Sequence, residues 1–454
     1  MVHNASQDAV SAAARRTAQL FIQCFPLLLT DMVRRVHPVG LHQFQLLQQG
    51  SGVIAPGLAE PDPRTVISTA WLDLGNEPLV LRLPDTHDRY ISVCLYDTAG
   101  DLVTAIGSRT GDDTGGDLAL AGPSWRGEFA RPSRARRMRT DCVWAVSRIQ
   151  AHGVLDRAET EALARRQRVT PIPVGPEVES LPCSTLDPPA RSTVRQALEI
   201  APSLFLHRLD PILARAPLSY QRDVRARLAS IREQIAELQG LDGEFDPDRA
   251  FAEEFAAAAA AIQVAAKTEP PRRPSGWRAP DSDEPPTSPR HAAARAYASL
   301  GAAPRDDLLR LVCETDEFGA PLSGVNGYTL QFAADQLPPV SGTWSLMVHP
   351  PQRQGRPLIS DHSELNLNPD GSLDIVIQGA PPEASEIFNW LPVPEEPFSL
   401  EMRLYGPRGP ALNLGWRMPA IHRSPPRDVS AAPRAAPAPG GHLSSVDEIE
   451  RLFR

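Results

Sequence analysis

The sequence predicts an α+β protein in which two antiparallel β-sandwich or jelly-roll-like domains are joined by a helical segment and followed by a disordered C-terminal tail. Residues 65–150 and 326–405 contain short apolar or alternating runs separated by Gly, Pro, Asp and Asn, a pattern typical of antiparallel strands. Between them, residues 188–266 place apolar side chains at helical spacing. The 47 prolines indicate many turns and linkers, because proline interrupts both helices and strand ladders.

The chain has 454 residues, which is enough for two or three domains because a single core stops growing near roughly 250–300 residues. Composition and periodicity divide it into six predicted segments. These are an N-terminal helix at 1–36, a first β domain at 37–187, a helical segment at 188–266, a Pro-rich linker with a short helix at 267–314, a second β domain at 315–423, and a flexible tail at 424–454.

The N-terminal helix contains an apolar run at 20–29 that follows Arg15 and Arg16. A signal sequence is a minority interpretation, since no small-residue cleavage site follows the run, and ten residues are too few to span a bilayer. We therefore expect no membrane span. The five cysteines are scattered and form no Cys-x-x-Cys pair, which indicates reduced, buried thiols and a cytoplasmic protein.

The formal net charge of −9 disfavours nonspecific binding to nucleic acid, which needs a basic surface. The Arg-rich stretch at 131–139 is a local exception. We interpret it as a solvated loop between strands, with a site for phosphate or an acidic partner as the alternative.

The helical segment carries one apolar stripe, and such a stripe packs into a core far more often than it binds a cofactor. A short helix is expected near 291–312, before the strands of the second β domain begin. The stripe consists of Val224, Leu228, Ile231, Ile235 and Leu238.

A set of short motifs then identifies a family. Asn-Trp-Leu-Pro at 389–392, Asn-Gly-Tyr at 326–328 and Trp-Ser-Leu at 344–346 resemble the C-terminal signature of paired bacterial families called domains of unknown function 1254 and 1214. Residues 68–74 and the Gly-Pro-Ser-Trp-Arg-Gly run at 122–127 are similar to the 1254-type motifs. The resemblance implies two β-rich domains joined by helices, the second one similar to the jelly-roll domains of peptide N-glycosidase; that similarity concerns the fold alone.

The chain departs from the family pattern at two places. Where the family carries an Asn-x-Asp-Thr-Leu-Tyr-like stretch, residues 63–67 read Pro-Arg-Thr-Val-Ile, so the acid and the tyrosine are missing. An Asn-Pro-x-x-x-Tyr-like segment expected after Trp344 is replaced by residues 349–360. If these positions form a site in the family, this protein has altered or lost it.

Candidate catalytic residues are Arg89, Asp97 and Asn389. Arg89 and Asp97 belong to one predicted strand region, where they form either an acid with its orienting partner or a structural ion pair. No Gly-x-Ser-x-Gly elbow, phosphate-binding loop, dinucleotide fingerprint or His-Glu-x-x-His helix is present in the sequence. Whether the protein is an enzyme is therefore left open, and so is any cofactor.

Trp344 and Trp390 are candidate ligand-binding aromatics for a sugar or another flat ligand. Large aromatics at strand ends are more often core residues, and that interpretation is the favoured one. For a metal, His349, Asp361, His362 and Glu364 bring two imidazoles and two carboxylates within sixteen residues. Their spacing matches no established ligand pattern, so a polar hairpin loop is the favoured interpretation.

The tail ends in a short amphipathic helical pattern with a capping box at Ser445 and Glu448. Such a helix needs a partner to bury its apolar face, and we hypothesise a docking peptide for another protein. An accidental amphipathic end, or one that folds back on its own domain, is the equal alternative. The partner-binding residues would be Val446, Ile449, Leu452 and Phe453.

Two function classes follow. The first is an enzyme-like scaffold that binds a small organic or glycan-like ligand between its β domains. The second is a noncatalytic accessory or cargo-type protein that is recruited through its tail.

Overall fold

The computed structural model describes most of the chain outside its C-terminal end. Two compact units are present. The first contains residues 1–268 and 284–304, and the second contains residues 269–283 and 305–454. The predicted docking residues lie outside the described residues, which are 2–37, 40–48, 54–58, 62–75, 77–111, 114–129, 134–153, 155–172, 185–186, 189–241, 243–267, 273–279, 284–349, 357–382, 389–413 and 415–424.

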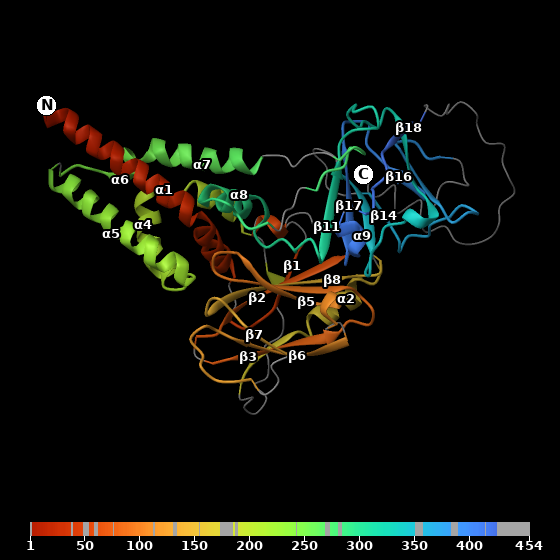
Figure 1. Cartoon of the computed structure of the whole chain (residues 1–454), viewed down its shortest axis with the longest axis horizontal. Coiled ribbons are helices and arrows are strands. Elements are labelled where there is room, and N and C mark those ends of the chain that lie inside the picture. The colour runs from red at the N-terminus through yellow and green to blue at the C-terminus, as the bar shows by residue number, and fades with distance from the viewer. Residues whose placement is uncertain are drawn as a thin grey trace. The chain divides into compact units, whose positions relative to one another are not determined.

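The first unit combines a helical layer with the first β domain (Figure 1). Helix α1 runs along the helical layer, and its inner face is buried from Ala13 to Val33. The apolar stripe of α5 packs into the same core, because Val224, Leu228 and Ile231 are buried there. The helices of this unit are α1 (Val2–Val36), α2 (Arg157–Ala164), α3 (Thr193–Leu198), α4 (Pro202–Leu213), α5 (Leu218–Leu241), α6 (Pro247–Ala250), α7 (Ala252–Ala266) and α8 (Pro289–Ser299).

Two sheets form the first β domain. The larger has the strand order β10-β1-β2-β8-β4-β5, and the smaller has the order β7-β6-β3-β9. Most neighbours are antiparallel; β1 with β10 and β6 with β7 are parallel. The strands are β1 (Gln45–Leu47), β2 (Thr65–Asp73), β3 (Leu79–Asp85), β4 (Ile91–Tyr96), β5 (Leu102–Gly107), β6 (Thr114–Ala121), β7 (Ala135–Arg137), β8 (Cys142–Gln150), β9 (Arg168–Pro171) and β10 (Thr185–Leu186).

The larger sheet is covered on both faces. Along β8, Val143 and Ala145 join the core shared with the smaller sheet, whereas Trp144 and Val146 join the core shared with the helices. Successive side chains of a strand point to opposite faces, so a strand between two layers is mostly apolar on both faces. This explains the apolar run at 142–146 in β8 and the mostly apolar sequence of β4.

The second unit consists of two four-stranded sheets whose apolar side chains share one core. The strand orders are β11-β17-β13-β14 and β16-β15-β12-β18, with one parallel pair, β15 with β16. The jelly-roll assignment stays a prediction. The elements are β11 (Leu308–Cys313), β12 (Gly327–Phe332), β13 (Trp344–His349), β14 (Leu358–Ser360), β15 (Leu373–Gln378), β16 (Trp390–Pro392), β17 (Ser399–Tyr405), α9 (Gly409–Leu412) and β18 (His422–Ser424).

The helix predicted near 291–312 is shorter than expected. Helix α8 begins after the N-cap Ser288 and ends at Ser299, and Gly301 then takes a φ of 86°, which favours glycine. Residues 308–313 alternate between buried and half-buried, and they form β11. The prediction was wrong there because a short alternating run was read as the continuation of a helix.

The chain is therefore an α+β protein. Four of the five cysteines, Cys24, Cys94, Cys142 and Cys313, are free and buried. Within the described ranges, no helix combines the length and the apolar character that crossing a membrane requires.

Candidate functional site

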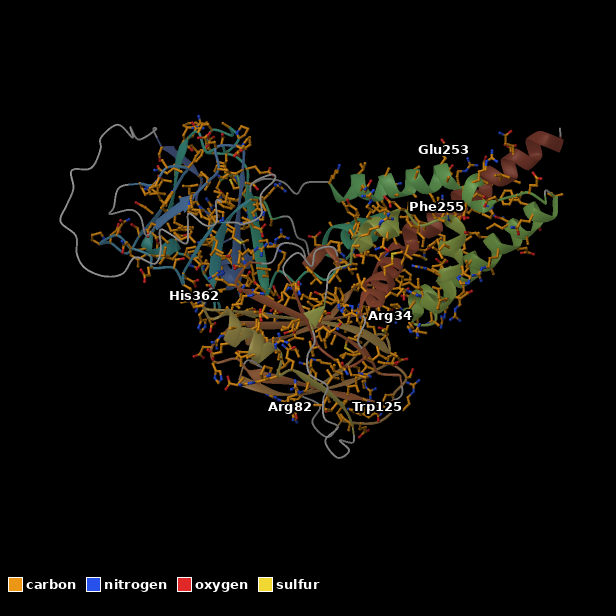
Figure 2. The ribbon with its side chains drawn as sticks, turned by 180° about the vertical axis from the view of Figure 1, so that it is seen from behind. Arg34, Arg82, Trp125, Glu253, Phe255 and His362 are labelled. Atoms are coloured by element: carbon orange, nitrogen blue, oxygen red, sulfur yellow. The ribbon has the colours of Figure 1, made fainter. Side chains whose placement is uncertain are left out.

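A hollow of about 330 Å³ lies in the first unit, where the end of α1 and the link between α4 and α5 meet loops of the first β domain. Arg34, Arg126, Arg139 and Arg215 line it, and we call it the arginine pocket. Figure 2 shows Arg34 at the end of α1 that approaches the strands. The four guanidinium groups come from four separate parts of the chain, so only the folded unit brings them together.

The four arginines differ in how many hydrogen bonds and ion pairs they form among the described residues. Arg34 donates to Asp31 Oδ1 at 2.9 Å, and Arg215 donates to the Pro211 carbonyl at 3.3 Å. Arg126 and Arg139 are exposed, and neither forms a hydrogen bond or an ion pair in the part of the chain that the structure describes. The pocket therefore offers two guanidinium groups whose donors are available to a ligand.

Arg137 holds the loop that carries Arg126. Its guanidinium donates to the carbonyl oxygens of Trp125 at 2.9 Å and Gly127 at 2.7 Å, the two residues that flank Arg126. The same group lies 5.1 Å from the ring centroid of Trp125 and 5.7 Å from that of Phe129. Cation–π contacts of this kind are worth about 0.5–1 kcal/mol at exposed sites. Arg137 thus fixes the backbone on both sides of a pocket arginine.

The glycines of the 122–127 run have steric roles in this loop. A Cβ on Gly127 would lie 2.3 Å from Cζ2 of Trp125, and a Cβ on Gly122 would lie 2.1 Å from Oδ1 of Asp141. Any larger residue at either position would displace the loop. The motif therefore describes a tightly packed loop at the edge of the pocket.

The remaining polar groups of the pocket are ordinary in reactivity. Asp141 Oδ2 accepts from the Ser124 hydroxyl at 2.9 Å, and Asp73 Oδ1 accepts from the Gly75 amide at 2.9 Å. Burial raises the pKa of Cys142 to about 11, although Arg34 and Arg215 act in the opposite direction. The thiol is therefore neutral near pH 7, and it is a poor nucleophile in that form.

Arg89 and Asp97 do not pair with each other, which corrects the predicted ion pair. The Arg89 guanidinium binds Asp156 through two hydrogen bonds, Nε to Oδ2 at 2.8 Å and Nη2 to Oδ1 at 2.5 Å. These contacts hold the pKa of Asp156 at about 2. Arg89 is 5% exposed, and it ties the start of β4 to the start of α2.

Asp97 lies in the turn between β4 and β5. Its Oδ1 accepts from the amides of Ala99 at 2.9 Å and Asp101 at 3.1 Å. Burial, followed by the nearby charge of Asp101, raises the pKa of Asp97 to about 6. The carboxylate is thus occupied by its own turn, and its catalytic role stays a prediction.

Asn389 and the two candidate tryptophans make structural contacts in the second unit. The Asn389 side chain bonds the backbone of Asn366 in both directions and also donates to the Asp374 carbonyl at 2.9 Å. Trp390 Nε1 donates to the Gln378 carbonyl at 2.9 Å. Trp344 is 5% exposed in the core beside Phe332. Their predicted roles towards a ligand remain predictions.

The four metal-site candidates are not gathered at one point. His349 Nε2 lies 3.1 Å from Oε2 of Glu401, whereas Asp361 accepts from the hydroxyl of Thr343. His362, labelled in Figure 2, and Glu364 are exposed. Among the described residues, no group of three His, Cys, Asp or Glu side chains is arranged to hold a metal ion.

Glu401 is the centre of a buried charge cluster on the sheet of the second unit. Arg403 Nε lies 2.5 Å and Arg310 Nε 2.9 Å from its Oε1, and the Glu401 side chain is 3% exposed. Burial by itself would raise the pKa of Glu401, but Arg403, His349 and Arg310 together hold it well below its usual range. This cluster is a closed ion-pair network, and no pattern along the sequence indicated it.

Family models match both β domains. A model described as a protein of unknown function (DUF1254) matches residues 41–171, and one described as a protein of unknown function (DUF1214) matches residues 308–409. The chain belongs to the paired DUF1254 and DUF1214 families. The resemblance inferred from the sequence motifs is confirmed, with the DUF1254 domain N-terminal to the DUF1214 domain.

Two solved structures are similar to this chain. The VPA0106 protein from Vibrio parahaemolyticus is 18% identical, with a TM-score of 0.57, and the match covers 91% of this chain and 100% of that chain. An uncharacterised protein from Burkholderia cenocepacia is 13% identical, with a TM-score of 0.40, and the match covers 93% and 96% of the two chains. The chain matches no curated protein. The first likeness shows the fold alone.

The DUF1254 domain supplies only part of the arginine pocket. Arg126 and Arg139 lie within the matched residues, whereas Arg34 of α1 and Arg215 of the link between α4 and α5 lie outside both matched segments. The sequence signal for Arg139 was the Arg-rich stretch at 131–139, which we interpreted as a solvated loop. Nothing in the sequence distinguished Arg34 or Arg215 from surface arginines.

Proposed function

We propose that this protein binds a small organic anion in the arginine pocket. The observation that carries the proposal is a hollow of about 330 Å³ lined by four guanidinium groups, two of which form no hydrogen bond or ion pair among the described residues. Pockets for small ligands typically measure roughly 300–1,000 Å³. Guanidinium groups bind carboxylate and phosphate oxygens through paired hydrogen bonds, which makes an anion the fitting ligand.

The charge of the lining supports the same conclusion. The pocket carries four guanidinium groups against the carboxylates of Asp73 and Asp141. Asp31 lies outside the lining and is shared by Arg34 and Arg35, so the lining keeps two more guanidinium groups than carboxylates. The protein as a whole carries a net charge of −9, so this local surplus is opposite in sign to the rest of the molecule. A local field of this sign attracts an anion into the hollow.

The proposal concerns binding and assigns no reaction. The pocket thiol is neutral near pH 7 because burial raises its pKa, and Ser124 is paired with an aspartate without a histidine in the lining. A serine nucleophile requires an adjacent base that takes its proton. We therefore propose a small organic ligand, as the sequence predicted, but at a different site. The proposed site is the arginine pocket, and the site predicted from the sequence was near Arg89, Asp97, Asn389 and Trp390.

Isothermal titration calorimetry at low ionic strength tests the proposal, with citrate, phenylacetate and inorganic phosphate as probes. We expect at least one probe to bind. Changing both Arg126 and Arg139 to Gln should weaken that binding about tenfold or more, because charge-assisted hydrogen bonds contribute about 1.5–3 kcal/mol each. Added salt should weaken it as well.

The matched control is Arg225→Gln, which removes an exposed arginine of α5 outside the pocket lining. It should leave the affinity unchanged. Absence of binding by every probe, or equal affinity in the double variant and the wild type, would overturn the proposal.

We propose separately that residues 424–454 dock onto a partner protein. The support is the capping box at Ser445 and Glu448 followed by the apolar positions Val446, Ile449, Leu452 and Phe453. Deleting 425–454, which leaves β18 intact, should abolish recovery of that partner in a pull-down from native lysate. Unchanged recovery would contradict the docking role.

A further inference from the structure

The arginine pocket also has an apolar side. Leu41 and Leu218 both line it, and they are 44% and 68% exposed. Leu218 is the first residue of α5, and Leu41 lies in the turn after α1. Single exposed leucines are common on protein surfaces, but two that line one charged hollow offer an apolar contact beside the guanidinium groups.

The size of the hollow excludes a simple inorganic ion as a good fit. A water molecule takes up about 30 Å³, so the volume of about 330 Å³ corresponds to roughly eleven water-sized positions. Phosphate and sulfate have five non-hydrogen atoms and would leave more than half of the hollow filled with water. A ligand that fills it needs an organic body.

The charge of the hollow favours an acid group. The lining holds two more guanidinium groups than carboxylates, because Asp31 is shared by Arg34 and Arg35. An acid group therefore enters the hollow without leaving its own charge unpaired. A carboxylate carries one charge near pH 7, and its two oxygens match the guanidinium fork.

We infer that the ligand is an organic carboxylate with an apolar body, on the order of ten non-hydrogen atoms in all. Its carboxylate binds Arg126 and Arg139, and its apolar body covers Leu41 and Leu218. This inference rests on the proposed function, since it names the class of anion that the same pocket takes.

A series of straight-chain carboxylates from acetate to octanoate tests the inference by calorimetry. Each methylene that becomes buried should raise the affinity by up to about fourfold, which corresponds to about 0.8 kcal/mol. Leu218→Ser should reduce this dependence on chain length. Changing Arg126 and Arg139 to Gln should lower the affinity of every acid by a similar factor and leave the dependence on chain length intact.

Leu241→Ser is the matched control, because Leu241 is the last residue of the same helix and is 79% exposed. It should change neither the affinity for the acids nor its dependence on chain length. 1-Octanol supplies the apolar body without the charge and should bind at least tenfold more weakly than octanoate.

The outcomes separate the two proposals. If affinity is independent of chain length but is lost when Arg126 and Arg139 are changed, the inference of an apolar body is wrong. The proposal that the pocket binds an anion is then still supported. Equal affinities for 1-octanol and octanoate would overturn the inference that the pocket recognises a carboxylate. Failure of the acids and of phosphate to bind overturns both proposals.

Discussion

Two groups of arginines, one in each unit, are used in opposite ways. In the second unit, Arg310 and Arg403 converge on the buried carboxylate of Glu401, and their charges are compensated within the fold. In the first unit, Arg126 and Arg139 line a hollow and form no hydrogen bond or ion pair among the described residues. The same side chain therefore stabilises the fold where a carboxylate is buried beside it, and it is available to a ligand where none is.

A similar contrast separates two buried carboxylates. Arg403, His349 and Arg310 keep Glu401 charged, because they hold its pKa well below the usual range. Asp97 is also buried, but its charged neighbours include Asp101, and burial raises its pKa to about 6. Burial alone therefore does not decide the state of a carboxylate; the charges around it do.

The largest expected effect comes from breaking the Glu401 cluster. Glu401→Gln removes the negative charge that two guanidinium groups share, and loss of one partner of a buried ion pair costs about 3–5 kcal/mol. Calorimetric unfolding should show the transition of the second unit at a clearly lower temperature. The control Glu364→Gln changes an exposed carboxylate and should shift it little. If Glu401→Gln lowers the free energy of unfolding by less than about 1 kcal/mol, the result would contradict the comparison between the units.

The second effect concerns pH and Asp97. The folded pKa of about 6 lies above the ordinary value of 3.8, so stability from this group is fully present below pH 3.8 and is lost as pH rises through 6. The full shift corresponds to roughly 3 kcal/mol. Asp97→Asn keeps an oxygen for the Ala99 and Asp101 amides without the charge.

Urea unfolding of the wild type and Asp97→Asn at several pH values between 4 and 7 measures this effect. The free energies of unfolding should be similar at pH 4, and the variant should become the more stable protein towards pH 7. Parallel curves across the range would show that Asp97 titrates normally in the folded state.

The smallest expected effect is on ligand affinity, and it tests whether Arg137 positions the loop at 122–129. Arg137→Ala removes the two hydrogen bonds to the carbonyls beside Arg126, so Arg126 loses its fixed position while its charge remains. Affinity for octanoate should fall about threefold to tenfold, and its salt dependence should stay as in the wild type. Arg137→Lys keeps the charge but loses the planar fork, and it should restore little of the affinity. Full affinity in Arg137→Ala would exclude a positioning role.

Much of the fold was predictable from local patterns. The apolar runs at 142–146 and 398–405 lie in β8 and β17, and the stripe of α5 packs into the helical core. The extended helix prediction at 291–312 failed at β11, where a short alternating run has to be distinguished from the end of a helix. Arg89 was predicted to act or pair with Asp97, but its partner is Asp156, which lies 67 residues away, beyond any local pattern.

The sequence by itself determined the family, the α+β class and the order of the two β domains, because motifs and periodicity are properties of neighbouring residues. Only the tertiary structure decided which arginines share a pocket and which surround Glu401. Arg34, Arg126, Arg139 and Arg215 are up to 181 residues apart in the chain and meet only after the helices pack on the β domain. Charge compensation depends on distance in space and on burial, and neither quantity is written in the local sequence.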